Sequence, residues 1–148
     1  MQKAYKLSII YYLIFSLLLI ASAVMLFEYK IGFSYEKILD YYLGNEDKFI
    51  PAKSTIGILK LALPHIFSFG LISMVLLHFL VFTKLRYKKS TLTVIYLTLF
   101  SAMLEIFTPM LIVNGFEYAA FLKLLSFFLF LTLILYISWL LLYSIIYD

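Results

Sequence analysis

Residues 118–146 read YAAFLKLLSFFLFLTLILYISWLLLYSII and contain a single charged side chain, that of Lys123. An α-helix needs ~20 predominantly apolar residues to cross the hydrocarbon core of a bilayer, so this stretch is long enough to span a membrane. The other apolar stretches of comparable length lie at about residues 7–27, 56–83 and 92–113. The sequence therefore predicts an all-α integral membrane protein, a four-helix bundle that forms one transmembrane domain over residues 1–148.

The overall composition excludes several classes of protein. Hydrophobic residues make up 65% of the chain and charged residues only 14%, whereas soluble domains have about 45–50% and about 25%. The chain has no cysteine, which excludes disulfides, iron–sulfur clusters, thiolate zinc sites and covalently attached c-type haem. The net charge of +4 comes from lysines beside apolar spans, where they attract anionic lipid head groups. We therefore expect the lipid bilayer, and not nucleic acid, as the partner.

The first apolar stretch has two interpretations. Its basic start, with Lys3 and Lys6, and its Ala21-Ser22-Ala23 tripeptide resemble a secretory signal with a small-residue cleavage site. The apolar run nevertheless continues to Phe27, which suits a retained span better than a short signal segment. We favour retention, with cleavage after Ala23 as the alternative.

Residues 28–56 form the one long polar segment. Within it, Ser34 can cap a helix, Glu36 suits a first turn and Gly44 can end the helix. The tyrosines between these positions favour the head-group layer of a membrane. We predict a short interfacial helix over 34–44, with a solvated loop as the alternative.

Basic residues set the expected orientation. One side of the bundle receives six of them in very short segments: Lys3, Lys6, Lys84, Arg86, Lys88 and Lys89. The lysines of residues 28–56 are spread over about thirty residues and are offset by acidic neighbours. The positive-inside rule therefore places both termini in the cytoplasm and residues 28–56 outside, in a cell membrane such as a bacterial inner membrane.

Pro64 divides the second apolar stretch, because proline lacks an amide hydrogen and clashes with the preceding turn of a helix. Two arrangements fit the sequence. Either one long helix kinks near Pro64, or residues 54–63 lie at the interface and Pro64 begins the span.

Four ionisable residues fall inside the predicted spans, where such groups are costly and mark candidate functional sites: His65, His78, Glu105 and Lys123. Glu105 lies about nine residues inside Asn114, and Lys123 about six inside Glu117, so the two occupy neighbouring layers. We expect an intramembrane ion pair between Glu105 and Lys123, with a proton or ligand site, or a Lys123 that snorkels to the interface, as alternatives.

Each histidine has a structural interpretation, in which its ring bonds to a hydroxyl or a backbone carbonyl. For His65 the expected acceptor is the carbonyl of Lys60, which Pro64 leaves without its helical donor. The stretches around the two histidines, Ala62-Leu63-Pro64-His65-Ile66-Phe67-Ser68-Phe69-Gly70 and Leu76-Leu77-His78-Phe79, also resemble the b-type di-haem cytochromes of quinone-linked respiratory complexes. The resemblance implies haem b as cofactor, with His65 and His78 as axial ligands of the iron.

The spacing of the histidines limits how such haem could be held. Thirteen residues separate them, which corresponds to about 20 Å along a helix and roughly 140° around it. The chain has no third histidine. A sixth ligand would come from Met25, Met103 or Met110, or from a second copy in a homodimer.

Other chemistry lacks the residues that it needs. No His, Asp or Glu lies three or four residues from His65, so a helical two-ligand metal motif is absent. The spans contain no aspartate pair for an intramembrane protease. Three hypotheses remain: a non-enzymatic accessory or structural subunit of a membrane complex, which we favour; a haem- or quinone-linked electron-transfer subunit; and a small transporter or channel.

Overall fold

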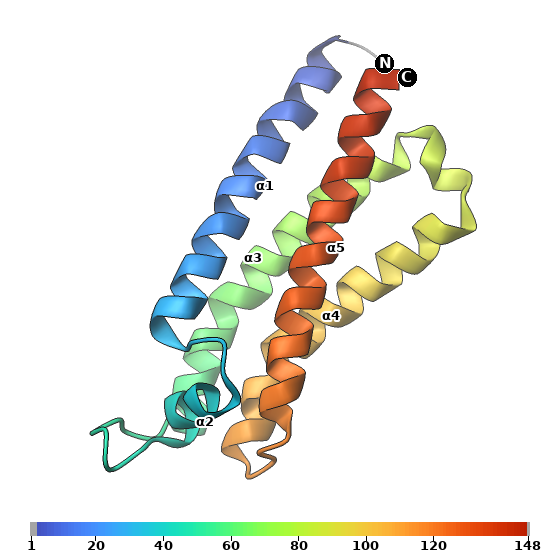
Figure 1. The fold of residues 1–148 in the computed structure, drawn as a ribbon. Helices are drawn as coiled ribbons and strands as arrows, with labels where there is room; N and C mark the ends of the chain where they lie inside the picture. Colours follow the sequence, from blue (N-terminus) through green and yellow to red (C-terminus); the bar gives the residue numbers. More distant parts are fainter. Residues whose placement is uncertain (1–2, 148) are drawn as a thin grey trace.

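The computed structural model describes residues 3–147, and it is helical throughout this range apart from the connecting segments (Figure 1). The elements follow in the order α1 (Lys3–Lys30), α2 (Tyr35–Leu43), α3 (Thr55–Val81), the 3-10 turn η1 (Lys84–Tyr87), α4 (Lys89–Val113) and α5 (Ala119–Tyr147). No strand occurs within residues 3–147, although Asn45 and Ile50 form an isolated bridge.

The helices α1, α3, α4 and α5 are each long and apolar enough to cross a membrane. This confirms the prediction of an all-α protein with four candidate spans. The helices differ from the predicted spans mainly at their ends. For example, α1 begins at Lys3 and continues to Lys30, beyond both limits of the predicted span 7–27.

The short helix α2 has the ends that the sequence predicts. The Ser34 hydroxyl accepts from the amide of Lys37 at 3.3 Å, and the amide of Gly44 donates to the carbonyl of Asp40 at 3.0 Å. Gly44 has φ +84°, and a Cβ there would lie 2.6 Å from the backbone nitrogen of Ala52, so only glycine fits this close approach. The buried side chains of Ile38 and Tyr42 form the inner face of α2, which packs against α4 and α5.

Helix α3 is continuous through Pro64, from Thr55 to Val81. Its first turn is capped by Ser54, whose hydroxyl accepts from the amide of Gly57 at 3.1 Å. Of the two arrangements that the sequence allows, the structure therefore has the single long helix, and not a span that begins at Pro64.

Both ends of the bundle are defined by contacts between segments far apart in the sequence. The ammonium group of Lys6, near the start of α1, donates to the carbonyl of Ile145, near the end of α5, at 2.8 Å. Lys84 and Lys88 line a small hollow together with Tyr143 of α5. The basic segments therefore share one end of the bundle, and α2 lies at the other (Figure 1).

Helices α1 and α3 contact each other mainly at the end of the bundle where the basic segments lie, called the basic end below. The ring of Tyr5 lies edge-on to Phe79 and Phe82, each at 5.7 Å between centroids, and the ring of Tyr12 lies edge-on to Phe79 at the same distance. Toward α2 a cavity lies between the two helices. This cavity contains the candidate site.

Candidate ligand cavity and buried ion pair

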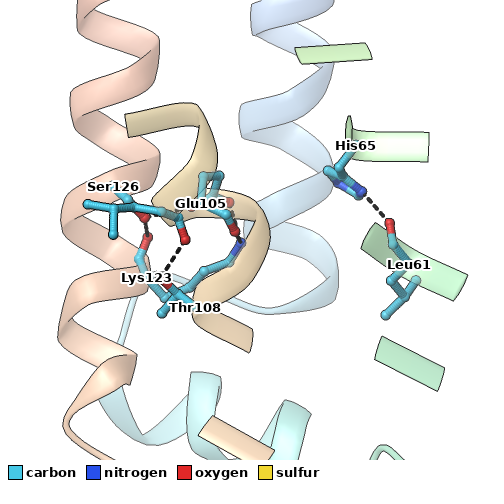
Figure 2. A network of polar contacts seen from close by, with 7 residues as sticks. Leu61, His65, Glu105, Thr108, Lys123 and Ser126 are labelled. Carbon is cyan, nitrogen blue, oxygen red and sulfur yellow. Dashed lines mark hydrogen bonds and ion pairs between the residues drawn. The ribbon is translucent and has the colours of Figure 1, made fainter. Parts of the chain in front are cut away.

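The structure brings Glu105 of α4 and Lys123 of α5 together in an ion pair (Figure 2). Both residues are buried, with 3% and 5% of their surface exposed. The ammonium group of Lys123 donates to the carboxylate of Glu105 through Oε1 and to the backbone carbonyl of the same residue at 2.9 Å. The hydroxyl of Ser126 donates to Oε2 at 2.9 Å. Both carboxylate oxygens of Glu105 therefore have hydrogen-bond donors from α5.

Pro109 explains why the backbone carbonyl of Glu105 is free to accept from another helix. In a regular helix this carbonyl would accept from the amide four residues later, but residue 109 is a proline inside α4 and has no amide hydrogen. Lys123 supplies the missing donor. The signal in the sequence is the spacing Glu105-Ile106-Phe107-Thr108-Pro109, whose consequence the sequence analysis missed.

His65 lies on α3 and has an exposed side chain. Its Nδ1 is 2.7 Å from the carbonyl oxygen of Leu61 (Figure 2). A carbonyl only accepts, so Nδ1 carries the hydrogen in this contact, and Nε2 is the ring nitrogen left for another partner. The expectation that Lys60 provides the acceptor is wrong. Residue i−4 lies on the same helix face as the histidine, toward which its side chain leans, whereas Lys60 is at i−5.

Between α1 and α3 lies a cavity of about 550 Å³, into which α2, α4 and α5 also contribute side chains. Most of its wall is apolar. The polar or charged residues in the wall are Ser22, Lys30, Tyr41, Tyr42, His65, Ser68, Glu105 and Lys123. The cavity thus places three of the four predicted site residues, His65, Glu105 and Lys123, around one space.

Tyr42 of α2 is a member of this wall that the sequence analysis did not single out. Its side chain is buried, with 4% exposed. Burial raises the pKa of the Tyr42 phenol far above its usual range, and the negative charge of Glu105 raises it further. The hydroxyl therefore stays protonated at neutral pH and can act as a hydrogen-bond donor.

His78, the second candidate haem ligand, lies outside the cavity. Its exposed ring is packed edge-on against Phe82, with 4.8 Å between centroids. None of the candidate sixth ligands, Met25, Met103 and Met110, lines the cavity either. A haem in this cavity would find one axial ligand, Nε2 of His65, so within one chain these residues do not fit a six-coordinate haem.

The small residues of α1 have distinct positions. Ser22 and Ala23 line the cavity, whereas Ala21 is exposed and lies outside it. Across residues 3–147, no group of three or more His, Cys, Asp or Glu side chains is arranged to hold a metal ion.

The family model described as a transmembrane helical domain, Aq_1264_TM, matches residues 32–148. No curated protein and no solved structure matches the chain. The matched segment contains α2 to α5 and begins just after α1.

Proposed function

The chain belongs to the transmembrane helical domain family, and from that premise we propose that it is a non-enzymatic accessory protein of the cell membrane that binds a lipophilic molecule between α1 and α3. The cavity of about 550 Å³ is the observation that carries this proposal. Ligand sites measure ~300–1,000 Å³ and are mostly apolar, with a few convergent polar groups that orient the ligand. This cavity has that size and that composition.

The exposure of the wall indicates where a ligand would enter. Phe15 and Leu18 of α1 and Leu61 of α3 line the cavity, yet each exposes at least 40% of its surface. The space therefore communicates with the outside of the bundle, which in a membrane is lipid. An apolar molecule could enter from the bilayer without crossing water.

Binding fits this wall better than catalysis does. The carboxylate of Glu105 is engaged by Lys123 and Ser126, and the hydroxyls of Ser22 and Ser68 donate to carbonyls of their own helices. The Ser126 hydroxyl, which donates to Glu105, is buried and does not line the cavity. Among residues 3–147, no hydroxyl that lines the cavity donates to His65 or to Glu105 in the pairing that activates a nucleophile.

A surface of α5 supports the accessory role. The rings of Tyr136, Trp139, Tyr143 and Tyr147 follow one another along the helix, with centroid separations of 6.1, 6.1 and 4.5 Å. All four side chains are exposed. Aromatic side chains are enriched at protein interfaces, so this row is a suitable contact for a helix of a larger membrane complex or of a second copy.

The cavity can be tested with a photoactivatable fatty-acyl probe and peptide mass spectrometry. We expect labelling of α1 and α3 residues in the cavity wall. Ala23→Trp fills the cavity and should abolish this labelling, whereas Ala21→Trp, two residues away on the outer surface of α1, should leave it unchanged. Labelling spread evenly over all exposed apolar residues, unaffected by Ala23→Trp, would reject the proposal.

Transport is a second candidate, favoured by the position of His65, Glu105 and Lys123 around one space. Beyond the cavity, toward the basic end, the aromatic contacts of Tyr5 and Tyr12 with Phe79 close the gap between α1 and α3. A transporter would have to open these contacts. Proton or ion flux into proteoliposomes, compared between the parent chain and Glu105→Gln, tests this hypothesis, and no flux in either would end it.

A further inference from the structure

We infer that the occupant of the cavity is a neutral lipophile whose head carries a carbonyl oxygen, such as a quinone or a carboxylic ester, with its chain directed away from α2. This inference rests on the proposed function, because it requires that the cavity binds a ligand. It is carried by the arrangement of polar and apolar side chains along the cavity and by the hydrogen-bond donors that remain free in its wall.

The ion pair and the tyrosines of the wall lie toward α2, whereas toward the middle of the bundle the wall is mainly apolar and the hydroxyls of Ser22 and Ser68 are bonded to their own helices. Tyr42 lies on α2 itself, and Lys123 is in the second turn of α5, close to that end. Phe15 and Phe69 line the cavity from the central parts of α1 and α3. A ligand with a polar head and an apolar chain fits this order of side chains in one direction only.

The length of the cavity suits one lipid chain. On α3 its wall extends from Ile58 to Phe69, which is about 17 Å at 1.5 Å per residue. The hydrocarbon core of a bilayer is ~30 Å thick, so the wall spans about one leaflet. A single chain can therefore lie between α1 and α3 with its head near α2.

The groups that remain free beside Glu105 are hydrogen-bond donors. An ammonium group has three N–H donors, and Lys123 uses two of them on Glu105. The hydroxyl of Tyr42 makes no hydrogen bond with any residue between 3 and 147. A carbonyl oxygen in the head of the ligand would satisfy such donors. Across the cavity, Nε2 of His65 can accept from a hydroxyl if the head carries one.

The charges in the buried part of the wall favour a neutral head. Glu105 and Lys123 neutralise each other. An anionic head placed beside Lys123 would also lie near the carboxylate of Glu105 and would lose its hydration without a free cation in compensation. Lys30, the remaining cation of the wall, is exposed at the end of α1.

The test uses the full chain in mild detergent and a radiolabelled decyl-substituted benzoquinone. Methyl laurate, sodium laurate and dodecane serve as competitors, so that ester, carboxylate and head-free chain are compared at similar length. We expect the quinone to bind and methyl laurate to compete, with dodecane weaker by about tenfold, the effect of about one hydrogen bond. Whichever of the two binds more tightly, the quinone or methyl laurate, shows whether the carbonyl of the ligand belongs to a quinone or to an ester.

A matched pair of variants assigns the effect to the head. Tyr42→Phe removes one hydroxyl and keeps the buried ring, and it should weaken quinone binding about three- to tenfold while leaving competition by dodecane unchanged. Tyr5→Phe is the control, because the hydroxyl of Tyr5 is buried without a partner but lies outside the cavity. Thermal unfolding of both variants verifies that they fold.

The results that would contradict the inference differ from those that would contradict the proposed function. If dodecane competes as well as methyl laurate, or if laurate competes better, the inference about a neutral carbonyl head is wrong while the cavity remains a ligand site. If neither the quinone nor any competitor binds, and the fatty-acyl probe does not label the cavity, the proposed function itself is wrong.

Discussion

The ammonium group of Lys123 on α5 lies 2.9 Å from the backbone carbonyl oxygen of Glu105 on α4. That carbonyl lacks a donor within its own helix because Pro109 has no amide hydrogen. Lys123 also pairs with the carboxylate of Glu105. One side chain of α5 therefore donates to the unpaired backbone carbonyl of α4 and also neutralises the buried carboxylate of the same residue.

Removing one member of this pair should be strongly destabilising. Lys123→Met leaves the Glu105 carboxylate buried without its cation, and loss of one partner of a buried pair costs about 3–5 kcal/mol. Glu105→Gln likewise leaves the ammonium group of Lys123 buried without its counter-ion. We expect each single variant to lower the unfolding midpoint in detergent, and the double variant to recover most of the loss because no charge is left unpaired.

The double-mutant cycle distinguishes a coupled pair from two independent polar residues. Additive losses in the double variant would contradict the role that the structure gives to the pair. Lys30→Met serves as a control, since that lysine is exposed and makes no ion pair that the structure shows.

Pro109→Ala should reduce the contribution of Lys123 to the free energy of unfolding. Alanine restores an amide hydrogen at position 109, so the carbonyl of Glu105 regains a donor within α4. Lys123→Met should then cost about 1 kcal/mol less in the Pro109→Ala background than in the parent chain, because one fewer acceptor is left unpaired. Equal costs in the two backgrounds, measured by unfolding in the same detergent, would show that the carbonyl contact adds nothing.

Much of the helix arrangement around Glu105 and Lys123 could be predicted from the sequence. It follows from the length and hydropathy of the apolar stretches and from the depth of each residue in its span. The four candidate spans are set by runs of apolar residues, and α2 is set by its cap at Ser34 and its stop at Gly44. The proximity of Glu105 and Lys123 follows from counting residues inward from the turn at 114–117. These features depend on local rules that tertiary packing does not override.

Other features depended on how helices far apart in the sequence pack, which spacing alone does not give. The cavity exists because α1 and α3 contact each other near Tyr5 and Phe79 but enclose a space toward α2. Tyr42 reaches it only because α2 packs under α4 and α5. The separation of His65 and His78 did follow from their spacing, which puts them roughly 140° apart around a helix, but the spacing did not show that one would line a cavity and the other would pack against Phe82.

The turn after α2 should loosen at acid pH. The side-chain amide of Asn45 donates to Asp40 at 2.7 Å and Lys48 contacts it at 2.6 Å, and these bonds lower the pKa of the Asp40 carboxyl. The stabilisation is fully present above the pKa of an unfolded aspartate, about 3.9, and is lost as the pH falls through the lower folded value. The protection of the Ile50 amide, which bonds to Asn45 at 2.9 Å, should fall in that range when its exchange rate is compared with the intrinsic rate at the same pH. Asp40→Asn should make this protection factor independent of pH there.

The proposed orientation can be tested with single cysteines, because the native chain contains none and gives no background. Asp47→Cys lies in the exposed segment after α2, and Lys89→Cys lies at the exposed start of α4. With both termini in the cytoplasm, a membrane-impermeant maleimide added to intact cells should label position 47 and should reach position 89 only after permeabilisation. The reverse pattern would invert the topology.

The different surroundings of the two histidines lead to a prediction about haem binding. His65 offers Nε2 to the cavity, but no second histidine and none of the three candidate methionines lines that space. A chain purified from cells that make haem should therefore show no Soret or alpha band in reduced-minus-oxidised spectra, unless two copies each contribute a histidine. If bands appear, their loss in His65→Ala with retention in His78→Ala would place the haem in the cavity. A halving of the protein mass in the complex, corrected for bound detergent, when His65→Ala removes the bands would then support one iron shared by two copies.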